Sequence, residues 1–154
     1  MGEAMKLPTL DELRAYIRST KLPFVIKGAL SVQDALRCAD LGAAGIILSH
    51  HNSLMRWAVP PVALLPEIRA ALEDSSFTLI ADGGFADGFD AFKALALGAD
   101  AVSVGKALMG PYDEKGAEGV ADTIREITGE LKAMLVRTGS PDPAHIDPDV
   151  IWRM

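Results

Sequence analysis

The stretch FTLIADGGFADGFDAFKALALGADAVSVGK, residues 77–106, decides the fold. Two apolar runs in it, Phe77–Ala81 and Ala101–Gly105, have the length and composition of buried strands. Between them, Phe89–Leu97 has the apolar spacing of a helix. Two nearly continuous apolar strands joined by a helix are typical of parallel strands, so this stretch predicts a parallel sheet in an α/β fold.

The same alternation extends outward from this stretch in both directions. A capping box formed by Thr9 and Glu12 predicts the start of the first helix. The remaining expected elements are helix Thr9–Ser19, strand Pro23–Gly28, a helix capped at Ser31, strand Ala44–Ser49, helix Leu64–Leu72 and a final helix from about Gly119 to Arg137. Four strands therefore alternate with helices, which indicates four successive strand–helix units.

An internal repeat supports this interpretation. One set of residues recurs 56 positions later with a single conservative change, Arg37 to Lys93. The two sets are Gly28, Asp34, Ala35, Arg37, Leu41, Gly42 and Ala43, and Gly84, Asp90, Ala91, Lys93, Leu97, Gly98 and Ala99. Repeated blocks of this kind are typical of a barrel or a segment of one, although a doubly wound open sheet gives the same pattern. A complete eight-unit barrel needs at least roughly 200 residues, so the 154 residues of this chain fit half of one.

The composition is that of a folded protein in a reducing compartment. The chain is 49% hydrophobic and 23% charged, and its net charge of -6 does not favour binding to nucleic acid. No apolar run approaches the ~18 residues of a membrane span, and the N-terminus lacks the apolar core of a signal peptide. With Cys38 as the single cysteine, we expect one cytoplasmic domain over residues 1–154 with no membrane partner.

Residues at the carboxyl ends of the strands are the candidates for chemistry, because parallel α/β proteins place their sites there. These ends are Lys27-Gly28, Ser49-His50-His51, Asp82-Gly83-Gly84 and Gly105-Lys106. The stem of Lys27 follows a buried run, so we expect its ammonium group at the site. The two glycine-bearing ends and Lys106 fit a phosphate site built from backbone N–H groups.

His50 and His51 are two of the three histidines of the chain. Neighbouring side chains at a strand end point to opposite sides, so one of the pair is expected to face the site as a general base. Alternation alone leaves open which one. Adjacent histidines do not easily reach one ion, and no metal site is predicted. Trp57 and Pro60-Pro61 are expected only to stiffen and pack the following loop.

Several motifs occur in the order and spacing of a known family. They are KLPFVIKG at 21–28, GIILSHH at 45–51, LPEI at 65–68, DGG at 82–84 and FKALALGADAVSVGK at 92–106. With these motifs the chain resembles the FMN-dependent α-hydroxy-acid oxidases and dehydrogenases, the group of glycolate oxidase, lactate oxidase and mandelate dehydrogenase. The resemblance covers residues 9–139 and leaves 140–154 as a C-terminal tail. It implies a single FMN-binding domain made of the last four strand–helix units, the C-terminal half, of a TIM (β/α)8 barrel.

The resemblance also implies roles for the strand-end residues. Lys27 would contact the N1/O2 edge of the flavin, and His51 rather than His50 would take a proton from the substrate. Ser49 would lie near the flavin. The residues that would hold its ribityl and phosphate oxygens are Asp82, Gly83, Gly84, Gly105 and Lys106. Lys106 stands where the family usually has arginine, so a point charge replaces a bidentate fork.

Two departures indicate a divergent subgroup. The family has Gly-Gly-Arg after its catalytic histidine and clamps the substrate carboxylate with that arginine. This chain has Asn52-Ser53-Leu54 there, and Arg56 is the candidate substitute for substrate binding. A phosphate-binding arginine is likewise replaced by Phe85-Ala86-Asp87, and Asp87 would repel a phosphate if it faced inward.

The resemblance therefore implies an FMN-dependent oxidoreductase, or its C-terminal half, that oxidises a small 2-hydroxy acid. His51 would abstract a proton while a hydride passes to the flavin. The alternative is a non-catalytic half-barrel that binds FMN or another phosphate ligand. Because a four-stranded half-barrel leaves two strand edges uncovered, we expect a homo-oligomer or a complex with a complementary N-terminal half-barrel chain.

Overall fold

The computed structural model describes residues 7–51, 57–72 and 76–152. Its elements in chain order are α1 (Leu10–Arg18), β1 (Val25–Ala29), α2 (Val32–Asp40), β2 (Gly45–Leu48), α3 (Pro61–Ala71), β3 (Thr78–Asp82), α4 (Gly88–Ala96), β4 (Ala101–Ser103), α5 (Lys106–Thr138) and the 3-10 turns η1 (Pro143–His145) and η2 (Pro148–Val150). Every expected strand and helix is present, and the boundaries differ mainly at α3 and α5.

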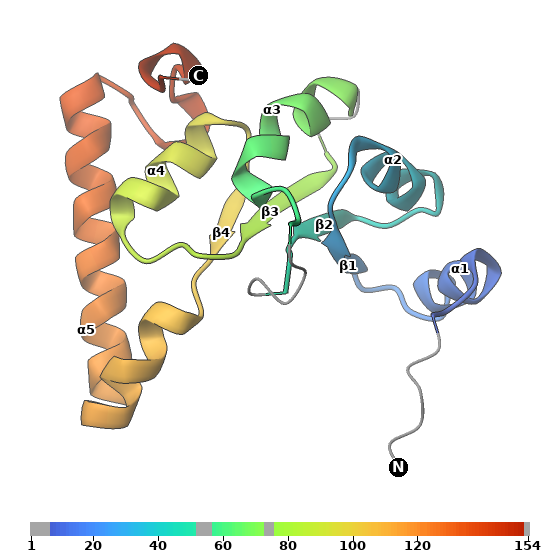
Figure 1. Cartoon of the computed structure of the whole chain (residues 1–154), viewed down its shortest axis with the longest axis horizontal. Coiled ribbons are helices and arrows are strands. Elements are labelled where there is room, and N and C mark those ends of the chain that lie inside the picture. The colour runs from blue at the N-terminus through green and yellow to red at the C-terminus, as the bar shows by residue number, and fades with distance from the viewer. Residues whose placement is uncertain (1–6, 52–56, 73–75, 153–154) are drawn as a thin grey trace.

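The four strands form one parallel sheet in the order β1-β2-β3-β4, so each strand pairs with its neighbour in sequence (Figure 1). The register between β2 and β3 is continuous, whereas the pairing of β1 with β2 shifts between Lys27 and Ala29. Helices α2, α3 and α4 connect consecutive strands. This arrangement confirms the predicted parallel α/β sheet.

The core lies between the sheet and the connecting helices. Side chains of a strand alternate between its two faces, and on β3 the fully buried residues are Leu79 and Ala81. They pack in one cluster with Ile46 of β2 and with Leu65 and Ile68 of α3, all of them fully buried. Burial of each such aliphatic side chain contributes about 1.5–3 kcal/mol, so this cluster holds the helices on the sheet.

The opposite face of the sheet is only partly buried. Lys27, Ile47 and Ile80 are register partners across β1, β2 and β3 on this face. Lys27 is exposed, and the two isoleucines are intermediate. A charged side chain thus lies beside apolar ones at the carboxyl end of this face.

The internal repeat of the sequence is also a repeat of structure. Helices α2 and α4 begin with equivalent N-caps, Ser31 and Asp87, whose side chains accept a backbone hydrogen bond at 3.0 and 2.7 Å. Each helix is followed by a glycine of positive φ, Gly42 at 89° and Gly98 at 106°. The carboxylate of Asp87 therefore caps its own helix.

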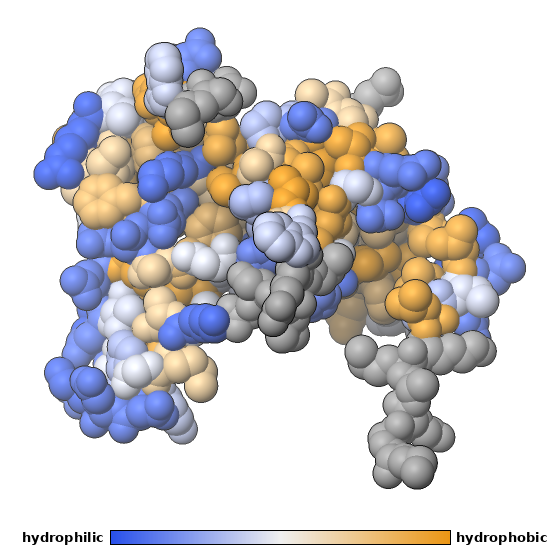
Figure 2. Space-filling view, viewed as in Figure 1, coloured by the Kyte–Doolittle hydropathy of each residue, from blue (hydrophilic) through white to orange (hydrophobic). Residues whose placement is uncertain are grey.

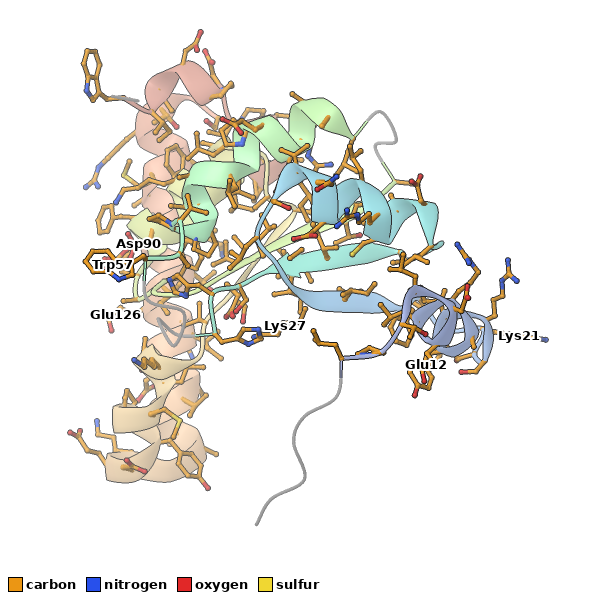
Figure 3. The ribbon with its side chains drawn as sticks, turned by 45° about the vertical axis from the view of Figure 1, so that its right-hand side comes forward. Glu12, Lys21, Lys27, Trp57, Asp90 and Glu126 are labelled. Atoms are coloured by element: carbon orange, nitrogen blue, oxygen red, sulfur yellow. The ribbon has the colours of Figure 1, made fainter. Side chains whose placement is uncertain are left out.

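Two expectations about the segment before α3 are wrong. Pro61 does not stiffen a loop, because it is the buried first residue of the helix, where a missing N–H costs nothing. As a result, α3 starts three residues before the expected Leu64. Trp57 does not pack on the loop, since it is fully exposed at 101% and stands at the surface (Figure 3).

The final helical element is longer than expected. Element α5 begins at Lys106, but Gly116 interrupts it with φ 61° and ψ -140°, so the helix after this kink starts close to the expected Gly119 and the segment before it is an additional helix. A Cβ atom at Gly119 would overlap the carbonyl oxygen of Pro111, so the two parts of α5 approach too closely for a side chain at this position. Since α5 begins at Lys106, this residue lies in the first turn of a helix.

The surface differs between the two ends of the fold. Helix α1 has no buried residue, and its Leu10 and Tyr16 are exposed. Figure 2 shows apolar side chains reaching the surface around α1 and α3, whereas hydrophilic side chains predominate along α5. Within the described ranges, no helix is both long enough and apolar enough to cross a membrane.

Candidate functional site

A cavity of about 670 Å³ lies at the carboxyl ends of the strands. Small-molecule sites commonly have volumes of about 300–1,000 Å³. The expected site residues that line the cavity are Lys27, His51, Asp82, Gly83, Gly84, Gly105 and Lys106. Residues from all four expected strand ends therefore meet around one space, with Lys27 at this edge of the sheet in Figure 3.

Asp82, the last residue of β3, is the centre of the hydrogen bonds at this edge. Its Oδ2 accepts hydrogen bonds from Lys27 Nζ at 2.8 Å and from Ser49 Oγ at 2.6 Å. Ser103 lies on β4, where the register places it opposite Asp82, and its side chain lowers the pKa of the same carboxylate. Side chains from three neighbouring segments thus converge on one carboxylate.

The pKa of Asp82 lies below its ordinary value. Burial is the largest single influence and raises this pKa, because it penalises the charged form. The hydrogen bonds from Lys27, Ser49 and Ser103, together with the positive charge of Lys27, outweigh the effect of burial. Asp82 is therefore ionised at neutral pH and supplies a counter-charge to the Lys27 ammonium group.

Replacing Asp82 with asparagine is expected to lower the free energy of unfolding by about 1–3 kcal/mol at neutral pH, because the charged acceptor of Lys27 and Ser49 is lost. The folded-state pKa of Asp82 is depressed, so its contribution is present above the unfolded pKa of about 3.9. That contribution is lost as the pH falls through the folded-state pKa. Urea unfolding curves of wild type and Asp82→Asn should therefore converge as the pH is lowered.

Asp122→Asn is the control for this experiment. Asp122 pairs with Arg125 on the exposed side of α5, and surface ion pairs contribute about 0–1 kcal/mol. The unfolding curve of Asp122→Asn should stay close to that of wild type at every pH measured. Equal stabilities of Asp82→Asn and wild type at neutral pH would contradict the role given to Asp82.

The two imidazoles lie towards different neighbouring strands. The ring of His51 packs on Gly28 of β1, where a Cβ atom would lie 3.0 Å from Nε2. The ring of His50 packs on Gly83 after β3, where a Cβ atom would lie 2.8 Å from Cε1. Of the two, His51 lines the cavity. It has a φ of 50°, so the chain has left extended conformation at this residue.

The loops after β3 and β4 present their backbone to the cavity. Gly83 and Gly84 have positive φ values of 116° and 88°, which suit glycine. At Gly84 and Gly105 a Cβ atom would meet nothing within 4 Å, so there is open space in front of the backbone. Gly105 is the N-cap of α5 and makes no side-chain capping bond. This helix terminus with the adjacent Lys106 is suited to an anion such as a phosphate.

Some functional positions were missed or cannot be placed. Ser103, Phe85, Ala86 and Ala107 also line the cavity, and only Ser103 had a usable signal, as a polar residue inside an apolar strand. Arg56, the candidate for substrate binding, lies outside the described residues. Among the residues that are described, no three His, Cys, Asp or Glu side chains gather as metal ligands.

Comparison with known proteins places the chain in a family. Residues 1–153 match the model of the FMN-dependent dehydrogenase family. The L-lactate oxidase of Alicycliphilus denitrificans is 38% identical over 151 residues, which are 97% of this chain and 41% of that protein. The 4-hydroxymandelate oxidase of Amycolatopsis orientalis is 39% identical over 125 residues, or 80% of this chain and 35% of that protein. The chain thus spans about two fifths of the length of these curated relatives.

Solved structures confirm the expected fold class. A mandelate oxidase variant with 2-hydroxy-phenylacetamide matches with a TM-score of 0.87 and 35% identity, over 91% of this chain and 42% of that one. Another variant of mandelate oxidase, with a monooxide FMN adduct, matches with a TM-score of 0.87 and 34% identity, over 92% of this chain and 45% of that one. The four strand–helix units correspond to half of a TIM barrel. By sequence and by structure, the chain belongs to the FMN-dependent dehydrogenase family.

Proposed function

We propose that this chain is the FMN-binding half of an oxidoreductase that acts on small 2-hydroxy acids. The observation that carries the proposal is the joint placement of Lys27, His51 and the two glycine-bearing loops around one cavity. Relatives that match 97% and 80% of the chain are named L-lactate oxidase and 4-hydroxymandelate oxidase, respectively. Their names favour a 2-hydroxy acid as the substrate class.

The residues present fit FMN at its phosphate end. Open space in front of Gly84 and Gly105 leaves room for phosphate oxygens next to the backbone. The first turn of α5 supplies N–H groups without a side-chain cap, and Lys106 adds a positive charge. Lys27 and Asp82 lie at the same cavity, where their polar groups are available to the rest of the cofactor.

The chemistry follows from the groups around the cavity. FMN, when bound, supplies the acceptor for the hydride that leaves the substrate carbon. His51 takes the proton of the substrate hydroxyl as general base. Lys27 would place its positive charge beside the flavin, which gains negative charge on reduction. Asp82 holds the ammonium group of Lys27 in place through a hydrogen bond of 2.8 Å. The chain therefore contributes proton removal, charge stabilisation and cofactor binding.

The proposal includes a partner for the open sheet. Strands β1 and β4 each pair on one side only within the described sheet, and the face with Lys27 and Ile80 is partly buried. Unpaired strand edges are sites of association. A second copy of this chain or a complementary half-barrel would cover these edges and close the site.

A second function is favoured by one feature of the sequence. The family's substrate-clamping arginine is absent from Asn52-Ser53-Leu54, and a cation two residues further on, at Arg56, need not keep the same bidentate geometry. Without that clamp, the chain would be a half-barrel that binds FMN or another phosphate ligand and does not oxidise a hydroxy acid.

An absorbance spectrum of the purified chain with added FMN tests both functions. Flavin bands that remain after gel filtration and bleach when lactate or mandelate is added without oxygen would support the oxidoreductase. A yellow protein that no 2-hydroxy acid bleaches would support the non-catalytic function, and a colourless one would contradict FMN binding in both and leave only a different phosphate ligand. Light scattering on the same sample gives the mass, and a flavin-bound monomer would contradict the proposed partner.

A further inference from the structure

The backbone at His51 is an unusual feature of the site that its proposed chemistry does not explain. His51 has a φ of 50°, a left-handed conformation that only a few per cent of non-glycine residues adopt, with Asn, Asp and His enriched among them. Such a conformation persists only when its surroundings hold it, and it is often found at functional sites. The interactions of His51 should therefore include the group that holds this turn.

One such group is the hydroxyl of Ser49, which fixes the peptide plane between His50 and His51, where the turn begins. The backbone N–H of His51 donates a hydrogen bond to Ser49 Oγ at 3.1 Å. Ser49 is fully buried, and its Oγ in turn donates to Asp82 Oδ2 at 2.6 Å. Since an ionised carboxylate is only an acceptor, the Ser49 proton must point at Asp82. This leaves the lone pairs of Oγ to accept the N–H of His51.

The conformation held in this way decides where the imidazole lies. With the turn in place, the His51 ring packs on Gly28 at the end of β1 and lines the cavity. An extended backbone at His51 would carry its side chain in another direction. The Ser49 hydroxyl thus acts on the proposed base without lining the cavity itself.

We infer that Ser49 is a positioning residue, whose hydroxyl, oriented by Asp82, anchors the peptide plane before His51 and so fixes the point from which the left-handed turn at His51 brings its imidazole into the cavity. The effect of Ser49 on catalysis rests on the proposed function, whereas its effect on the position of His51 does not. A residue that only contacts the cofactor would not need the hydrogen bond that Ser49 makes to the backbone of His51. Ser103 offers a matched comparison, because it is a second serine whose side chain acts on the Asp82 carboxylate, from the register position opposite it on β4.

Nuclear magnetic resonance on the full chain tests the inference without flavin. In wild type we expect a nuclear Overhauser contact between the His51 ring and the Gly28 Hα protons, and a protected His51 amide. In Ser49→Ala the contact should be lost, and the His51 amide should exchange about tenfold faster, which is the usual effect of one lost hydrogen bond. Ser49→Thr keeps the hydroxyl and should keep both signals. Ser103→Ala should also keep both.

Each outcome bears on the inference. An unchanged His51–Gly28 contact in Ser49→Ala would overturn it, and so would equal losses in Ser49→Ala and Ser103→Ala, because Asp82 alone would then hold the turn. If Ser49→Ala does not fold, the wild-type spectra decide, since a missing contact or an unprotected His51 amide overturns the inference. Wild-type protein that shows both signals but no bleaching by a 2-hydroxy acid would reject the proposed function and leave the role of Ser49 standing.

If bleaching does occur, its rate provides a second readout. Ser49→Ala should slow flavin reduction at saturating substrate by about 10²-fold, the effect of a misplaced catalytic group. FMN affinity should change much less. Loss of FMN affinity with an unchanged reduction rate would show that Ser49 serves the cofactor and would overturn the inference.

Discussion

Reduction of bound flavin by a 2-hydroxy acid is expected to slow by roughly 10²–10⁴-fold when His51 is replaced with glutamine, the usual contribution of a positioned general base. Glutamine keeps a polar side chain of similar length but cannot take the substrate proton. FMN affinity should stay near that of wild type, because the phosphate-binding loops are untouched. Anaerobic stopped-flow measurement of flavin bleaching gives the rate.

His50→Gln is the matched variant for this prediction. His50 precedes the base directly in sequence but packs on Gly83 and does not line the cavity. Its substitution should slow reduction far less than that of His51. Comparable losses in the two variants would show that the loop, rather than one base, had been damaged.

Lys106→Ala is expected to weaken FMN binding by about 10- to 150-fold, which corresponds to about 1.5–3 kcal/mol for a hydrogen bond to a charged group. Lys106 lies at the cavity in the first turn of α5, beside the uncapped N–H groups. Its removal leaves the helix terminus in place but deletes the positive charge. Titration of FMN fluorescence measures the affinity.

Lys132→Ala serves as the control for the loss of a lysine from the same helix. Lys132 is exposed on α5 and does not line the cavity. Its FMN affinity should equal that of wild type. If Lys106→Ala binds FMN as tightly as Lys132→Ala does, the phosphate is bound elsewhere.

The fold was predictable wherever burial and local chemistry act on the same residues. Apolar runs such as Phe77–Ala81 must be buried, and caps such as Thr9 satisfy backbone groups at the start of a helix, so both leave a pattern in the sequence. The start of α5 left no such pattern. Pro111 and Gly116 are usual signs of a loop, but here the chain turns back on itself, and close packing at Gly119 holds the two parts together.

The site was predictable only where its residues directly follow a strand, by the rule that parallel α/β proteins place their sites at the carboxyl ends of strands. That rule found Lys27, Asp82 and Lys106, because parallel strands bring their carboxyl ends to one edge. It did not find Ser103, whose part in the site depends on the register with Asp82. It also gave no reason to expect a left-handed backbone at His51, since the peptide plane before this turn is anchored by a hydroxyl and a carboxylate from different strand ends.

The strand order β1-β2-β3-β4 also bears on how the chain folds. Each strand pairs only with the strands before and after it, so every pairing closes a loop no longer than the segment between consecutive strands. The longest of these segments, residues 49–77, contains α3. Closing short loops costs little entropy, and folding is faster when contacting residues are near in sequence. During synthesis, each strand can therefore pair with the preceding one as soon as it emerges from the ribosome.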